Sequence, residues 1–146
     1  MAYERAVHFY RKTSVETADQ IKLIVMCYEE TIQAISQAKI YFDQGEFESK
    51  SKYLVKAQSI IQELYSCLNK EKGGAIAANL ASLYSYSLNR LVQGDVGKDM
   101  SAFDEVASLF TELLTGWQGI AADREAKAKL PKSLETRAVA PRGIAV

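Results

Sequence analysis

The residues of this chain that could do chemistry are few and widely separated. Its only histidine is His8, so no pair of histidines and no Glu-x-x-His pattern can build the two-metal carboxylate site of some helical bundles. A phosphotransfer bundle needs an exposed histidine halfway along a helix, whereas His8 precedes the first predicted helix. Both kinds of protein are therefore disfavoured.

The acidic pairs and the glycine pair are equally poor candidates for catalysis. Glu29–Glu30 and Asp104–Glu105 are adjacent residues in predicted helices, so their side chains point to different sides and do not converge on a substrate. Gly73–Gly74 indicates a junction between helices, because no P-loop, Gly-x-Ser-x-Gly or Gly-x-Gly-x-x-Gly motif surrounds it. We predict that the chain is not an enzyme and has no catalytic, cofactor-binding or metal-binding residue.

Four segments between residues 17 and 122 repeat apolar side chains at intervals of three and four, which places them on one face of a helix. No segment alternates with a period of two, so strands are not expected. We predict an all-α fold, an antiparallel up-down four-helix bundle spanning residues 17–122. The predicted apolar seams are Ile21, Ile24, Tyr28, Ile32, Ile35 and Phe42; Leu54, Ala57, Ile61, Leu64 and Leu68; Ile76, Ala77, Leu80, Leu83, Tyr84, Leu88, Leu91 and Val92; and Phe103, Val106, Phe110, Leu113, Leu114 and Trp117.

Local signals predict where these helices begin and end. Small polar side chains cap helix starts, and glycine often follows a helix end. The signals are a capping box at Thr17–Gln20, a stop at Gly45, an end near Asn69, a junction at Gly73–Gly74, a stop at Gly94, and a cap at Asp99 or Ser101.

Composition indicates a protein partner and a cytoplasmic location. The 146 residues include 18 basic and 18 acidic side chains, so the chain lacks the positive charge expected of a nucleic-acid-binding protein. Cys27 and Cys67 lie inside predicted helices, where free cysteine commonly behaves as a small apolar residue. We expect no signal peptide and no membrane span, because no sufficiently long apolar stretch is present.

Both ends of the chain differ from its middle. Residues 1–16 contain Tyr3, Phe9 and Tyr10 but are too short to form a core, so we predict a segment that docks onto the bundle. Residues 123–146 lose the helical period and carry six basic and three acidic side chains. We predict that this second segment is a disordered tail.

The predicted helices carry more apolar surface than their seams require. Tyr53, Ile60 and Cys67 follow one edge of the second helix, and Leu109, Leu113 and Ile120 follow an edge of the fourth. Two explanations remain open at this point. A four-helix core needs wide apolar faces, or the edges form a groove for an amphipathic helix of a partner. Further apolar residues lie away from the seams, namely Leu23, Met26, Tyr41 and Tyr86.

Two stretches of the chain and one tryptophan form a specific combination. The first stretch runs from Tyr10 through Thr17–Ala18 to Leu23-Ile-Val-Met-Cys-Tyr28, and the second is Lys72-Gly-Gly-Ala-Ile-Ala-Ala-Asn-Leu-Ala-Ser-Leu-Tyr-Ser-Tyr86. Together they resemble the opening and the Gly-Gly-x-x-Ala-x-Asn-Leu-x-x-Leu-Tyr-x-Tyr segment of the FliS family of flagellar secretion chaperones, and Trp117 stands where the last helix of that family has a tryptophan. The resemblance covers about residues 3–122. Departures from the family pattern are Asp19, Glu29–Glu30 and Gly94–Asp95, none of which removes a seam residue.

The resemblance implies a cytosolic chaperone that binds the disordered C-terminal region of flagellin. It would prevent premature polymerisation of flagellin and support its delivery to the export apparatus, with a component of the flagellar export gate as a further partner. A helical adaptor for an unrelated protein remains the alternative, and the chain is expected to be a monomer or a weak homodimer. The residues expected to contact the partner are Tyr10, Tyr53, Ile60, Leu109, Leu113 and Ile120.

Overall fold

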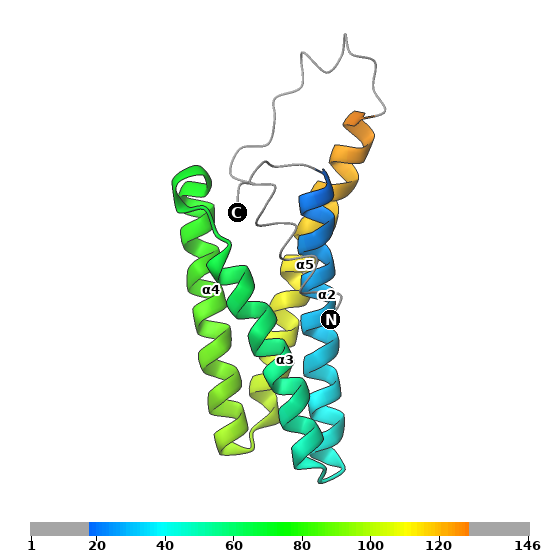
Figure 1. The fold of residues 1–146 in the computed structure, drawn as a ribbon, viewed down its shortest axis with the longest axis vertical. Helices are drawn as coiled ribbons and strands as arrows, with labels where there is room; N and C mark the ends of the chain where they lie inside the picture. Colours follow the sequence, from blue (N-terminus) through cyan, green and yellow to red (C-terminus); the bar gives the residue numbers. More distant parts are fainter. Residues whose placement is uncertain (1–17, 129–146) are drawn as a thin grey trace.

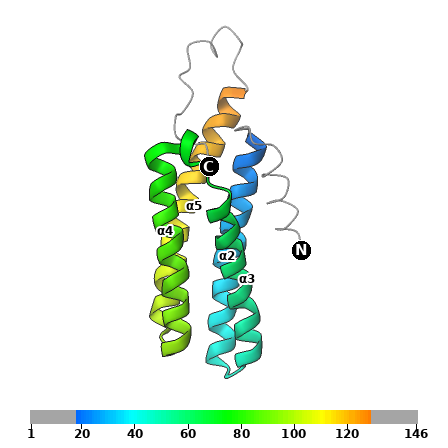
Figure 2. The ribbon, with the colours of Figure 1, turned by 60° about the vertical axis from the view of Figure 1, so that its left-hand side comes forward.

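A computed structural model describes residues 18–128 of the chain. These residues form the predicted all-α four-helix bundle. Its helices are α2 (Ala18–Asp43), α3 (Phe47–Ser66), α4 (Lys70–Gly97) and α5 (Met100–Ala128), and no strand occurs within this range. The short turns reverse the chain between successive helices, so neighbours run antiparallel (Figure 1). Helices α3 and α5 each pack against both α2 and α4, which places α2 and α4 at opposite corners of the bundle. Figure 2 shows all four lying lengthwise beside one another.

The core consists of most of the predicted seam residues together with small residues that the sequence pattern did not indicate. The assignment of Ile76 and Val92 to the third seam is wrong, because these side chains are 44% and 50% exposed. Most seam residues are buried, including Tyr28, Tyr84 and Phe110, whose rings meet at the centre of the bundle. Thr31 and Ser87 are also fully buried, and each hydroxyl donates to a backbone carbonyl one turn earlier in its helix. These internal hydrogen bonds satisfy the hydroxyls, which explains how polar side chains occupy core positions.

Ion pairs join each pair of neighbouring helices. Lys56 Nζ of α3 lies 3.0 Å from Glu30 Oε2 of α2, and Arg90 Nε of α4 lies 2.6 Å from Glu105 Oε1 of α5. The remaining two pairs are Lys50 with Asp95, between α3 and α4, and Lys39 with Asp104, between α2 and α5.

Three of the predicted boundaries are confirmed. Gly45 follows the end of α2 with a φ of 74°, in the left-handed region that favours glycine. Helix α3 ends at Ser66, close to the predicted Asn69. Asp99 caps α5, because its carboxylate accepts a hydrogen bond from the Ser101 backbone N–H at 3.0 Å. The other cap signal, at Thr17–Gln20, begins outside the described residues.

The glycine pair lies inside α4 instead of preceding it. The helix begins at Lys70, because the Asn69 side chain caps it by accepting from the Lys72 N–H at 3.0 Å. Gly74 then interrupts the helix, with a φ of 53° and a ψ of −128°. The predicted junction at Gly73–Gly74 is therefore a kink that separates a capped first turn from the main part of α4.

The prediction that Gly94 ends the third helix is wrong. Helix α4 continues to Gly97, and Lys98 follows in the left-handed conformation with a φ of 53°. Gly94 is buried because the start of α5 crosses it closely. A Cβ atom at this position would lie 2.8 Å from Ala102 Cβ. The glycine thus permits close helix packing and does not terminate the helix.

The last helix is longer than predicted. We expected the tail to begin at residue 123, but α5 continues to Ala128. Residues 123–128 are rich in alanine, glutamate, lysine and arginine, which have high helix propensity even without an apolar period. The rest of the predicted tail, and the docking segment at residues 1–16, lie outside the described residues.

Candidate partner-binding surface

No cluster of reactive side chains accompanies the bundle in the part of the chain that the structure describes. Residues 18–128 contain no group of three or more His, Cys, Asp or Glu side chains that could hold a metal ion. Burial raises the pKa of the Cys27 thiol from 9.0 to about 12, and the nearby Cys67 adds to the shift. A thiol that stays protonated at neutral pH is a poor nucleophile. None of the four helices has an apolar stretch long enough to cross a membrane.

The predicted edge of α3 is largely occupied by contacts within the bundle. The ring of Tyr53 stacks on Tyr41 of α2, with 5.5 Å between ring centroids and 15° between planes. Ile60 has no exposed surface and belongs to the hydrophobic core, while Cys67 is half-buried against it. The expectation that Ile60 lies at an open edge is therefore wrong, because at this position α3 is apolar to widen the core.

The predicted edge of α5 lies on its α4 side and remains partly open. The Tyr86 hydroxyl donates to Glu105 Oε2 at 2.6 Å, so the side of α5 that carries Glu105 faces α4. Leu109 is one helical turn beyond Glu105, and Leu83 is one turn before Tyr86, so both share this side. Leu83 and Leu109 are half-buried but are not packed against the central core cluster.

We call this surface the α4/α5 strip. Leu113 and Ile120 extend it along α5; both are half-buried and rest against the core. Tyr86 is 45% exposed, so nearly half of its surface is open to solvent. The strip thus brings together the three predicted contact residues of α5 with two from α4. Its members are Leu83, Tyr86, Leu109, Leu113 and Ile120.

A charged network borders the strip. Glu105 accepts hydrogen bonds from both Tyr86 and Arg90, and these bonds lower the pKa of its carboxyl group. The same hydrogen bond raises the pKa of Tyr86, because ionisation of the phenol would remove the donor. Glu105 is therefore ionised and Tyr86 neutral at neutral pH. These hydrogen bonds restrain the Tyr86 side chain.

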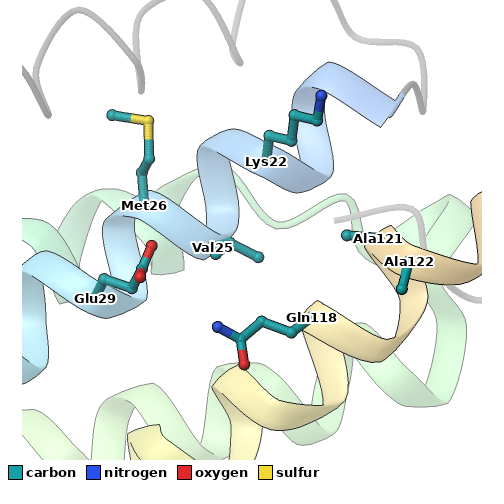
Figure 3. Close-up of a pocket in the computed structure, with 7 residues that line it drawn as sticks. All are labelled: Lys22, Val25, Met26, Glu29, Gln118, Ala121 and Ala122. Atoms are coloured by element: carbon teal, nitrogen blue, oxygen red, sulfur yellow. The ribbon is translucent and has the colours of Figure 1, made fainter. Parts of the chain in front are cut away.

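A separate pocket lies between α2 and α5. It has a volume of about 280 Å³. Figure 3 shows Val25 and Gln118 extending from facing helices into the space between them. Met26, which we had placed away from the seam of its helix, is 40% exposed at this pocket. Among the described residues, those that line the pocket are Lys22, Val25, Met26, Glu29, Gln118, Ala121 and Ala122.

Comparison with known proteins identifies the family of the chain. Residues 2–124 match the family model described as flagellar protein FliS. The chain belongs to the FliS family. It is 35% identical over 116 residues to the flagellar secretion chaperone FliS of Salmonella typhimurium, covering 76% of this chain and 86% of the relative. It is 32% identical over 126 residues to the chaperone FliS of Bacillus subtilis, covering 86% and 93% of the two chains.

FliS is a family of flagellar secretion chaperones, not of enzymes, and this chain is a member of that family. A third relative, the flagellar secretion chaperone FliSB of Pseudomonas aeruginosa, is 32% identical over 120 residues, with 80% of this chain and 95% of the relative covered. The family match ends at residue 124, four residues before α5 does.

Sequence reasoning missed several residues of these surfaces. The apolar spacing predicts Leu83 as a core-seam residue, and it does not single out Val25, Ala121 or Ala122. Period alone identifies the apolar face of a helix, but it does not show which flank meets which neighbour. The only signal that pointed to the pocket was Met26, an apolar residue outside the seam. Tyr10 lies outside the described residues.

Proposed function

We propose that this FliS-family chaperone binds the C-terminal segment of flagellin in the cytoplasm. Binding would keep the segment from polymerising early and support its delivery to the flagellar export apparatus. The observation that carries the proposal is the α4/α5 strip, a row of apolar side chains that the bundle leaves partly uncovered. Membership of a family of flagellar secretion chaperones supports it.

Masking by contact is sufficient for such a function. A flagellin terminal segment must bury an amphipathic face when it enters a filament, so a helical platform that covers this face blocks assembly without nucleotide or metal. The segment loses conformational entropy when it folds on the chaperone. Part of the contact energy is offset in this way, which allows a large and specific interface to remain releasable.

The strip provides the apolar contacts that we assign to flagellin. A helix lying along α4 and α5 would place its apolar side on Leu83, Leu109 and Leu113, with Ile120 extending the contact along α5. Tyr86 adds an exposed aromatic ring, a residue type enriched at protein interfaces. Ile60 is not part of this proposed contact, because a fully buried side chain has no surface to offer. Tyr53 is likewise left to its stacking with Tyr41.

Calorimetric titration with a flagellin C-terminal peptide tests the proposal. We expect Leu109→Asp to weaken binding about a hundredfold, because a charge would be buried in an apolar interface. Val55→Asp is the matched control, since Val55 is an apolar residue that is 57% exposed on α3, a helix that contributes nothing to the strip. If the folded Leu109→Asp variant binds the peptide with the same affinity as the unchanged chain, the strip is not part of the interface.

Two further measurements separate this function from its alternative. The circular dichroism of the mixture should show more helix than the summed spectra of the components, because the segment folds on binding. A pull-down from flagellated cells should recover flagellin as the main partner. Recovery of another protein without flagellin would favour a helical adaptor for a different partner.

A further inference from the structure

The pocket between α2 and α5 lies on the other flank of α5 from the α4/α5 strip. Asp104 pairs with Lys39 of α2, so the flank of α5 that carries Asp104 faces α2. Gln118 is about four turns further along the same flank. Within residues 18–128, the residues that line the pocket come from these two helices. A ligand in the pocket would therefore contact a different surface from a helix on the strip.

The shape of the pocket suits apolar side chains of a helix better than a free small molecule. Its volume of about 280 Å³ lies just below the range of roughly 300–1,000 Å³ that is typical of small-molecule sites. Its lining follows helical spacing on both sides, with Lys22, Val25, Met26 and Glu29 on α2 and Gln118, Ala121 and Ala122 on α5. The small side chains of the two alanines allow another backbone to approach closely.

The charges at the pocket define the partner further. Lys22 and Glu29 are seven residues apart, so they lie about two turns, or roughly 10 Å, apart on the same face of α2. Val25 and Met26 occupy the turn between them (Figure 3). A complementary helix has an apolar residue at its centre, with an acidic residue about one turn away on one side and a basic residue about one turn away on the other.

We infer that the α2/α5 pocket docks an amphipathic helix of a partner protein with this acidic–apolar–basic pattern. The apolar residue enters the pocket beside Val25. The acidic residue lies near Lys22, and the basic residue lies near Glu29. This inference does not depend on flagellin binding to the strip, and the two surfaces can be tested separately in the full-length chain.

Three synthetic helical peptides test the inference. Each has a central leucine, and their flanking charged residues are Glu and Lys, Glu and Glu, or Lys and Lys. Fluorescence anisotropy should show that the unchanged chain prefers the Glu/Lys peptide. Lys22→Glu should make the Lys/Lys peptide the tightest, and Glu29→Lys should do the same for the Glu/Glu peptide. Each mismatched charge should cost about two- to fivefold in affinity, as for other partly exposed ion pairs. Peptides with mixed charges can bind in either direction, but this ranking does not depend on the direction.

Two controls make the outcome decisive. Val25→Asp should reduce binding of all three peptides at least tenfold, whereas Val55→Asp, on a helix that lines neither surface, should leave their affinities unchanged. The inference is overturned if the ranking of peptides is the same in all three chains, or if the unchanged chain binds none of them. It is also overturned if Val25→Asp leaves peptide binding unchanged. Loss of flagellin binding alone would contradict the proposed function and leave this result intact.

Discussion

The phenol oxygen of Tyr28 lies 2.5 Å from that of Tyr84, which joins α2 to α4 across the centre of the bundle. The two helices occupy opposite corners, and the ring of Phe110 packs against both tyrosines, at centroid distances of 5.1 and 6.0 Å. Both hydroxyls are buried, so each needs a partner inside the protein. A buried hydrogen bond of this kind favours the arrangement in which these two residues lie at the same level of the bundle, over other arrangements of the same apolar side chains.

Phenylalanine substitutions at the two tyrosines should each weaken the bundle, and their effects should be coupled. Either substitution removes the hydrogen bond between the Tyr28 and Tyr84 hydroxyls and leaves the other hydroxyl buried without that bond. We expect each to lower the free energy of unfolding by about 1–2 kcal/mol. Urea unfolding of both variants and of the double variant measures these costs. The double variant should lose less than the sum, because no hydroxyl of the pair remains buried. Strictly additive costs would contradict this coupling.

The bundle should lose stability between about pH 9 and pH 12. Burial raises the pKa of Cys27 from 9.0 to about 12 and that of Tyr28 from 10.0 to about 12. In this range the folded chain retains protons that the unfolded chain has lost, so stability is fully present at lower pH and decreases as the pH rises. Each group contributes up to about 1.4 kcal/mol per pH unit. Urea unfolding at several pH values tests this, and Cys27→Ala should flatten the profile just above pH 9. Parallel profiles for the two chains would exclude the thiol as a cause.

Gly94→Ala should destabilise the corner between α4 and α5. The added Cβ would lie 2.8 Å from Ala102 Cβ and 2.9 Å from the Asp99 carbonyl oxygen, so the helices must move apart. We expect a cost of about 1–3 kcal/mol, typical of overpacking. Gly116→Ala is the matched control, because a Cβ there would meet nothing within 4 Å and alanine favours a helix. It should raise stability by about 0.5–1 kcal/mol. Thermal unfolding compares the two variants, and a stabilising Gly94→Ala would refute the packing role.

Deletion of residues 1–11 tests the predicted docking segment and Tyr10. If the segment covers part of the partner surface in the free protein, the truncated chain should bind flagellin modestly tighter and self-associate more. Calorimetry and light scattering measure the two effects. Unchanged affinity and unchanged solubility would argue against such a lid, and a large loss of affinity would instead place Tyr10 in the interface.

The pattern of apolar residues was sufficient to predict the helices but not their relations to one another. Spacing alone placed Tyr28, Ile61 and Phe110 in the core, because a helix of known period has only one apolar face. Whether Ile60 widens the core or borders a groove depends on how closely α2 approaches α3, which no local pattern encodes. Gly94 shows the same limit, since glycine suits both a helix end and a close helix crossing. The partly open flank of α5 became identifiable only when the contact between Tyr86 and Glu105 showed which side faces α4.

The ion pairs between neighbouring helices bear on the handedness of the bundle. An up-down bundle can turn to the right or to the left from its first hairpin, and the same core-facing side chains would be buried in either case. The four basic residues of these pairs lie on the flanks of their helices, and each meets its acidic partner only with the observed handedness. They are Lys39, Lys50, Lys56 and Arg90. In the mirror arrangement every flank would face the other neighbour, and all four pairs would be separated. Each pair adds little to stability, yet together they penalise the alternative topology that the core alone would tolerate.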